Sequence, residues 1–235
     1  LYNKAISKID IVQDIAKELP APPVQAYFLC DCWYVSEKII NTFAVQGFHT
    51  IGALKTNRLL YPSGMKKKLS ELAAELSVTH KNFDLVTVKG KNYYVYRYES
   101  NLNGIENAIV LFSYPEKAFG KPKALRTFLC MDVSLSTNEI LDNYVCRWPI
   151  EVFFRQCKDK LALDSYQIRS AQGIRRYWLI MSFAHYMCVV GTGKVCPFET
   201  GYRKISDIIQ MEKYLTLYQC ARECIGFDSF VKVVA

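Results

Sequence analysis

Four side chains with charged or phenolic ends recur at helical spacing within residues 144–158. They are Tyr144, Arg147, Glu151 and Lys158. On an α-helix, at about 100° per residue, these four fall within an arc of about 60°, and Arg155 widens the arc to about 80°. Such a face would set one carboxylate among three cations and a phenol. Pro149 is expected to kink or restart the helix just before Glu151, because proline has no backbone N–H.

Two interpretations of this face are open when the segment is taken alone. An amphipathic helix with intrahelical ion pairs gives the same pattern, because opposite charges three or four positions apart pair readily on a helix surface. Trp148 and Phe154 border the charged stripe, which places a buried side next to it. A further acid, Asp31, ends the short apolar run 24–30, as a buried strand does when it reaches the edge of a parallel sheet.

The pattern in these two segments resembles that of a known family. Residues 144–158 are similar to the Tyr-Arg-Glu-Lys signature of DDE transposases of the insertion-sequence four superfamily, and residues 29–34 (Leu-Cys-Asp-Cys-Trp-Tyr) resemble the segment around their second catalytic Asp. The separation of Asp31 from Glu151 (151 − 31 = 120) also fits their interrupted core. The resemblance covers about residues 1–190. It implies an α/β, ribonuclease H-like (retroviral-integrase-like) core that is interrupted by a β-rich insertion.

The resemblance also implies an activity, namely Mg-dependent phosphodiester hydrolysis and strand transfer at transposon ends. Asp31 and Glu151 would be catalytic carboxylates that hold two Mg²⁺ (or Mn²⁺) ions, which prefer oxygen ligands and stabilise both the attacking and the leaving oxygen. An arginine fork and a lysine point charge suit the binding of DNA phosphates. The implied DNA-binding residues are Tyr144, Arg147, Lys158, Lys55 and Arg155.

A third catalytic carboxylate is expected upstream of Leu1. In this kind of fold the first Asp lies on the first strand, several elements before the second Asp, whereas thirty residues precede Asp31. Asp10 and Asp14 fall on the polar side of a predicted helix, where we expect surface charges. We therefore expect an N-terminally truncated transposase fragment that is inactive by itself.

The charge distribution is typical of a protein that binds a polyanion. The chain has 30 Lys+Arg against 22 Asp+Glu, a net charge of +8. Three windows, 38–70, 117–131 and 165–198, together hold fourteen cations and no acid. Such surfaces attract DNA because each neutralised phosphate releases counterions, although solvated basic loops give the same pattern. We expect double-stranded DNA as the partner, and the resemblance implies a homodimer in the complex that pairs the two ends.

The composition excludes several other classes of protein. A hydrophobic share of 51% with 22% charged residues indicates a globular rather than a disordered chain. The longest apolar run, 177–190, is too short to span a bilayer, so no membrane partner is expected. Nine Cys and three His without zinc-ligand spacing indicate a reduced, cytosolic protein without a structural metal. The resemblance implies that this location is the bacterial cytosol or nucleoid.

The hydrophobic pattern predicts the elements that position these residues. Helices at 7–19 and 36–46 alternate with strands at 24–30 and 48–54, an α/β arrangement. A helix at 66–76 precedes strands at 85–88, 93–98, 108–113 and 127–132, with a turn at 103–104, and a capping box at Ser136 starts a mainly helical region. The predicted division is 1–60, first part of the core; 61–135, β insertion; 136–195, helical second part of the core; and 196–235, C-terminal helical segment.

Three functions are compatible with these observations, and a DDE transposase is the leading one. The alternative is a non-catalytic DNA-binding remnant or a domesticated transposase-derived protein, which would share the basic windows and lack the first Asp. A third is a ribonuclease H-like nuclease that cuts DNA without transposing it.

Overall fold

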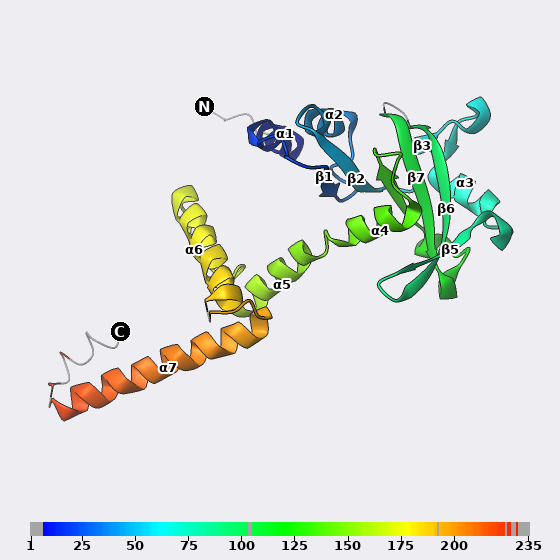
Figure 1. Cartoon of the computed structure of the whole chain (residues 1–235). Helices are drawn as coiled ribbons and strands as arrows, with labels where there is room; N and C mark the ends of the chain where they lie inside the picture. Colours follow the sequence, from blue (N-terminus) through cyan, green and yellow to red (C-terminus); the bar gives the residue numbers. More distant parts are fainter. Residues whose placement is uncertain (1–6, 103–104, 192, 224, 227–228, 230–235) are drawn as a thin grey trace. The chain divides into compact units, whose positions relative to one another are not determined.

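A computed structural model describes residues 7–102, 105–191, 193–223, 225–226 and 229. The chain forms two compact units, residues 1–148 and residues 149–235. We call them the sheet unit and the helical unit, because the described strands all lie in the first (Figure 1). The α/β class predicted from the sequence is confirmed. The finer division into core and insertion stays a prediction, and the turn predicted at 103–104 lies outside the described residues.

The sheet unit begins with the alternation of helices and strands that the sequence predicts. The elements are α1 (Lys8–Glu18), β1 (Ala26–Cys30), α2 (Glu37–Val45) and β2 (Phe48–Leu54). Ser7 and Ser36 cap the two helices, since each hydroxyl accepts a backbone N–H of the first turn. The two strands pair in parallel, with Cys30 opposite Gly52. Parallel pairing brings the loops that follow both strands to the same edge of the sheet.

The remaining strands extend this sheet in antiparallel fashion. They are β3 (Leu59–Leu60), β4 (Lys67–Lys68), β5 (Asp84–Val88), β6 (Lys91–Leu102), β7 (Ile105–Pro115) and β8 (Arg126–Cys130). The strand order is β1-β2-β8-β7-β6-β3-β4, with β5 paired to β6. The helix predicted at 66–76 is shorter, α3 (Leu69–Leu76), because Lys67 and Lys68 pair with β3 instead.

Both faces of the sheet are buried. On β7, Val110 and Phe112 point to one face while Ile109 and Leu111 point to the other, and all four are fully buried. The first face packs against residues of α2 and α3, and the second packs against Ile140 of α4 (Thr137–Val145). Burial on both faces holds β1 and β2 in place, and with them the loops at their carboxyl ends.

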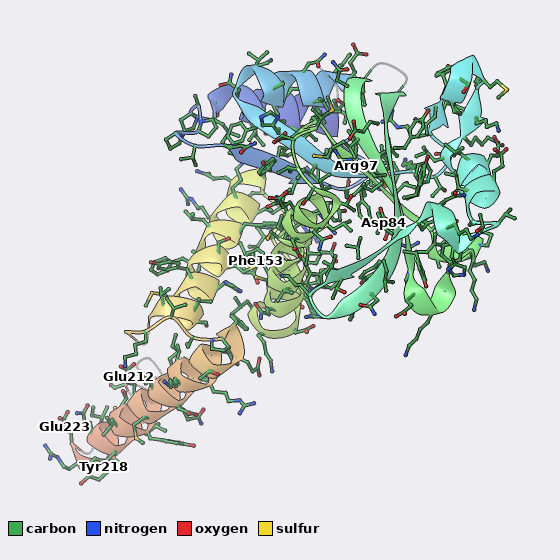
Figure 2. The ribbon with its side chains drawn as sticks, turned by 45° about the vertical axis from the view of Figure 1, so that its right-hand side comes forward. Asp84, Arg97, Phe153, Glu212, Tyr218 and Glu223 are labelled. Carbon is green, nitrogen blue, oxygen red and sulfur yellow. The ribbon has the colours of Figure 1, made fainter. Side chains whose placement is uncertain are left out.

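The loop that leads into α4 is tied to the sheet. Arg97 of β6 donates from its guanidinium to the carbonyl oxygens of Leu135 and Val133, at 2.6 and 3.1 Å (Figure 2). The predicted capping box at Ser136 is confirmed, because its hydroxyl accepts the backbone N–H of Glu139 and the Glu139 side chain accepts the backbone N–H of Ser136. These bonds determine where α4 begins.

The helical unit consists of α5 (Pro149–Leu161), α6 (Ala171–Val190) and α7 (Phe198–Arg222). Cys157, Leu163 and Met181 form its buried cluster. Gly201 lets α7 approach α6, since a Cβ at this position would lie 1.6 Å from the Cys188 carbonyl oxygen. The sequence suggests that 177–190 is apolar core, yet Leu179 is among several large exposed side chains of α6. None of the helices in the described part of the chain is long and apolar enough to cross a membrane.

Candidate active site

Asp31 directly follows β1 at the carboxyl edge of the sheet. Its Oδ1 accepts the backbone N–H of Trp33 at 2.8 Å, and its carbonyl oxygen accepts the N–H of Tyr34 at 3.2 Å. This tight turn, of a kind that Asp favours, orients the half-buried carboxylate through its own loop. Asp31 does follow a strand, as the sequence predicts, but β1 is the outermost strand of the sheet and only Cys30 within it is fully buried, so the expectation of a buried strand is wrong.

The Asp31 loop lies on a closely packed floor. A Cβ at Gly52 would come within 2.5 Å of Val35 Cγ2 and 2.9 Å of Cys30 Sγ, so the floor requires glycine. Burial, with a further contribution from the charge of Asp31, raises the pKa of the Cys30 thiol to about 12. Cys30 therefore acts as a neutral packing group, and sequence reasoning did not single out Gly52.

Two cations from the loop after β2 hold the loop after β1. Arg58 Nη2 donates to the carbonyl oxygen of Val35. Lys55 Nζ lies 3.8 Å from the centroid of the Trp33 ring. The sequence predicts Lys55 as a DNA contact, and the structure places this exposed side chain at the same edge as Asp31. The sequence did not predict that Arg58 and Trp33 would hold these loops. The available signals were the position of Arg58 in an acid-free window and the position of Trp33 two residues after Asp31.

The helix expected through residues 144–158 is interrupted before Glu151, where Pro149 is expected to kink or restart it. α4 ends at Val145, and the turn 146–148 is closed by i→i−3 bonds such as Arg147 N–H to the Tyr144 carbonyl oxygen at 3.1 Å. α5 then starts at Pro149, as the missing proline N–H predicts. The computed arc of 60° therefore does not apply to the four motif residues.

Tyr144 and Arg147 nevertheless meet at the Asp31 edge. The Arg147 guanidinium carbon lies 5.6 Å from the centroid of the Tyr144 ring, which itself packs on Phe128 at 4.8 Å. The charges of Asp31 and Arg147 both influence the pKa values of Cys30 and Tyr144. Burial raises the pKa of Tyr144, and the positive charge of Arg147 opposes that rise. Tyr144 and Arg147 of the motif thus contact each other within the sheet unit and share electrostatic neighbours with Asp31.

The other motif residues belong to the helical unit. Glu151 is in the first turn of α5, where the helix dipole favours a carboxylate. Arg155 and Lys158 follow at i+4 and i+7, so the three share one side of α5, and all are exposed. The two carboxylates predicted to hold metal are therefore divided between the units, with one in each.

The carboxylates of the candidate site are of the chemical type that binds a hard divalent ion. Carboxylate oxygens are the ligands that Mg²⁺ prefers, and Asp31 offers them at an open sheet edge. Among the residues that the structure describes, no group of three or more His, Cys, Asp or Glu side chains gathers into a metal site. Asp10 and Asp14 lie on the surface of α1, bonded to Ser7 and Lys17, as expected of helix-surface charges.

Part of the first basic window is neutralised by α3. Lys67 Nζ lies 2.6 Å from Glu75, and Lys68 Nζ lies 3.5 Å from Glu71, two acids that follow the window in sequence. Lys66 is exposed. The absence of acids along the chain therefore overstates the positive charge of this surface.

A comparison with protein families agrees with these features. The sequence matches the family described as "Transposase DDE domain" over residues 3–187, more than three quarters of the chain. No curated protein matches the chain. The matched span includes Asp31, Tyr144, Arg147 and Glu151. The chain therefore belongs to the DDE transposase domain family, whose members bind and cleave DNA in the transposition of mobile elements and generally use divalent metal ions.

Proposed function

We propose that this chain carries the cutting and joining site of a transposase of the insertion-sequence four superfamily, built on a ribonuclease H-like core. The observation that carries the proposal is the grouping of Asp31, Tyr144 and Arg147 at the carboxyl edge of β1, within a span that matches the family. An acid beside a guanidinium and a phenol can orient a phosphodiester next to a metal ligand.

The carboxylates that would hold Mg²⁺ are Asp31 and Glu151. When bound, such ions activate the attacking oxygen and stabilise the leaving oxygen of the phosphodiester. The backbone N–H of Trp33 already orients the Asp31 carboxylate. We propose that the described residues supply two of three carboxylates, since Asp10 and Asp14 are surface groups of α1.

The DNA would be held by groups from both units. Arg147 is half-buried, which limits its movement and suits its fork to a phosphate of fixed position. Tyr144 stays protonated because burial raises its pKa, so its hydroxyl can donate to a phosphate oxygen. Lys55, Arg155 and Lys158 are exposed and would contact the backbone of double-stranded DNA in the bacterial cytosol.

We also propose a homodimer, supported by one face of α7. Ile208, Met211, Leu215 and Tyr218 are exposed and follow the spacing 3-4-3. This spacing is typical of paired helices, because side chains three and four positions apart form one stripe. Glu212 and Tyr218 are labelled along α7 in Figure 2.

The test uses the complete natural protein, Mg²⁺, and DNA that carries the ends of the mobile element encoding it. Asp31→Asn and Glu151→Gln should each abolish end cleavage and leave end binding nearly unchanged, because each removes a metal ligand and no cation. Asp14→Asn, a surface acid of α1, is the control and should cleave normally.

Cleavage at the wild-type rate in either variant would show that the carboxylate in question is not a ligand. A wild-type protein that binds the ends in Mg²⁺ without cutting them would instead identify a DNA-binding remnant.

A further inference from the structure

The sheet face that packs against α4 is longer than that helix. α4 has 9 residues and is about 14 Å long, whereas the 11 residues of β7 span about 36 Å. A helix of this length covers only part of the face. Apolar side chains of the same face continue along the neighbouring strands, among them Tyr93 of β6 and Phe128 of β8.

A cavity of about 230 Å³ lies between the last turn of α4 and these strands. Leu141, Tyr144 and Val145 form its helical wall, because positions i, i+3 and i+4 share one side of a helix. Tyr93 and Phe128 belong to the wall that the sheet provides. An engineered apolar cavity of about 150 Å³ already holds one benzene molecule. The cavity beside α4 therefore has room for one substituted or fused ring.

Arg126 supplies the charge in the lining of this cavity. It stands opposite Ser113 in the pairing of β7 with β8, so both side chains lie on the α4 face of the sheet. Both hydrogen bonds that its guanidinium makes to the described part of the chain use Nη1, with the carbonyl oxygens of Lys123 and Leu125 at 3.1 and 2.9 Å. Nε and Nη2 can therefore donate to the oxygens of an anionic group.

A second cavity, of about 420 Å³, adjoins the first, since Tyr93 and Pro115 line both. Its lining includes Lys91 and Lys117 and one acid, Glu116. Together with Arg126, the described residues that line the two cavities thus include three cations and one acid. An excess of positive charge around an apolar cavity favours a ligand that has an apolar body and a negative group.

We propose that the cavity between α4 and the sheet binds a small aromatic anion, one ring system with a single carboxylate or sulfonate group. The ring packs against Tyr144 and Phe128, whose own rings lie 4.8 Å apart and present an aromatic surface. The anionic group bonds to the Arg126 guanidinium. The site lies within the sheet unit and uses neither Asp31 nor Glu151, so the inference goes beyond the proposed function.

The experiment titrates the complete natural protein with three probes in a calorimeter, at neutral pH and constant salt. Naphthoate carries both the ring and the negative charge, naphthylmethylammonium carries the ring with a positive charge, and inorganic phosphate carries negative charge without a ring. Wild-type protein should bind naphthoate about tenfold or more tightly than either other probe, because only naphthoate uses both the apolar walls and Arg126.

Three variants assign the binding to this cavity. Arg126→Gln, a change at an exposed position, should weaken naphthoate binding by about fivefold to twentyfold without weakening the ammonium probe, because charge-assisted hydrogen bonds are lost. Val145→Phe enlarges a lining side chain and should abolish binding of both ring probes. Lys121→Gln removes an exposed cation outside both linings and should bind naphthoate as wild type does.

Equal affinity of the wild type for naphthoate and naphthylmethylammonium would identify an apolar contact surface and overturn the inference. Equal affinity for naphthoate and inorganic phosphate would identify a basic surface without a ring site, with the same consequence. Unchanged naphthoate binding in Arg126→Gln would also overturn it. DNA cleavage is not measured, so these outcomes are separate from those of Asp31→Asn and Glu151→Gln, which test the proposed function.

Discussion

Arg147 lies in the turn between α4 and α5, half-buried, with its guanidinium facing the Tyr144 ring. The charge of Arg147 acts on Cys30 and on Tyr144, the two groups on which the charge of Asp31 also acts. When DNA arrives, the same guanidinium can form two parallel hydrogen bonds to a phosphate. At the scale of single residues, the planar shape of the Arg147 guanidinium as well as its charge therefore determines how this position would bind DNA.

Substitution of Arg147 separates these two contributions. Arg147→Ala should weaken end binding and reduce the slope of log affinity against log salt by about one, because one phosphate contact is lost. Arg147→Lys should keep the slope and lose part of the affinity, since it retains the charge without the fork. Binding titrations at several salt concentrations measure the affinity and the slope for both variants. An unchanged slope in Arg147→Ala would show that this residue does not contact a DNA phosphate.

Buried thiols and one phenol predict a loss of stability at alkaline pH. Burial raises the pKa of Cys30 and Tyr27 to about 12 and that of Cys130 to about 11, above the ordinary values of 9.0 and 10.0. The folded state holds these protons more tightly than the unfolded state. The stabilisation is complete below about pH 9 and is lost as the pH rises toward 11–12.

Urea unfolding followed by circular dichroism measures this effect. The free energy of unfolding should fall by on the order of 1–3 kcal/mol between about pH 8 and about pH 11. Cys30→Ala should show a smaller decrease, because one of the three groups is gone. The same decrease in Cys30→Ala and wild type would show that Cys30 does not contribute.

At the scale of elements, the parallel pair β1 and β2 positions the site. Cys30 faces Gly52 across the pair, so the loops with Asp31 and Lys55 emerge side by side. The pairing leaves no room for a side chain at Gly52, where a Cβ would meet Val35 Cγ2 at 2.5 Å. The close packing of Val35 and Cys30 beside Asp31 therefore depends on that one glycine.

Gly52→Ala should destabilise the sheet unit by about 1–3 kcal/mol, the usual cost of overpacking a core. In a Val35→Ala background the same substitution should cost less, because the closest atom has been removed. Urea unfolding of the four proteins of this cycle gives the coupling, and Gly226→Ala, with nothing within 4 Å of its Cβ, is the neutral control. Equal costs in both backgrounds would mean that the Val35 contact does not limit this position.

At the scale of the whole molecule, the residues proposed to bind DNA or metal occur in both units. The sheet unit carries Asp31, Tyr144 and Arg147, and the helical unit carries Glu151 and Lys158. The net charge of +8 is only partly available to DNA, since Lys67 and Lys68 pair with acids of α3. The exposed stripe on α7 has the spacing that suits the proposed association of two copies.

Leu215→Glu should dissociate the proposed dimer, because it puts a charge in the centre of the apolar stripe. Sedimentation velocity should show a dimer for wild type and a monomer for the variant. Lys213→Ala, a change at an exposed position outside the stripe, should remain dimeric. A monomeric wild type, or a Leu215→Glu variant that stays dimeric, would exclude α7 as the contact.

What the sequence by itself determined is local. Ser7, Ser36 and Ser136 cap their helices, Asp31 follows a strand, and Pro149 restarts a helix, because each effect depends on a few neighbouring residues. The family resemblance was also available, since the motif spacing lies along the chain.

Only the tertiary structure decided which distant residues support the acid. The parallel pairing of β1 with β2 produces three such contacts. They are Lys55 against the Trp33 ring, Arg58 bonded to the Val35 carbonyl oxygen, and the close packing that leaves no room for a side chain at Gly52. The same holds for Lys67, which is neutralised by an acid eight residues away. Such contacts join groups that no periodicity relates, so they appear when strands and helices pack and cannot be read from spacing.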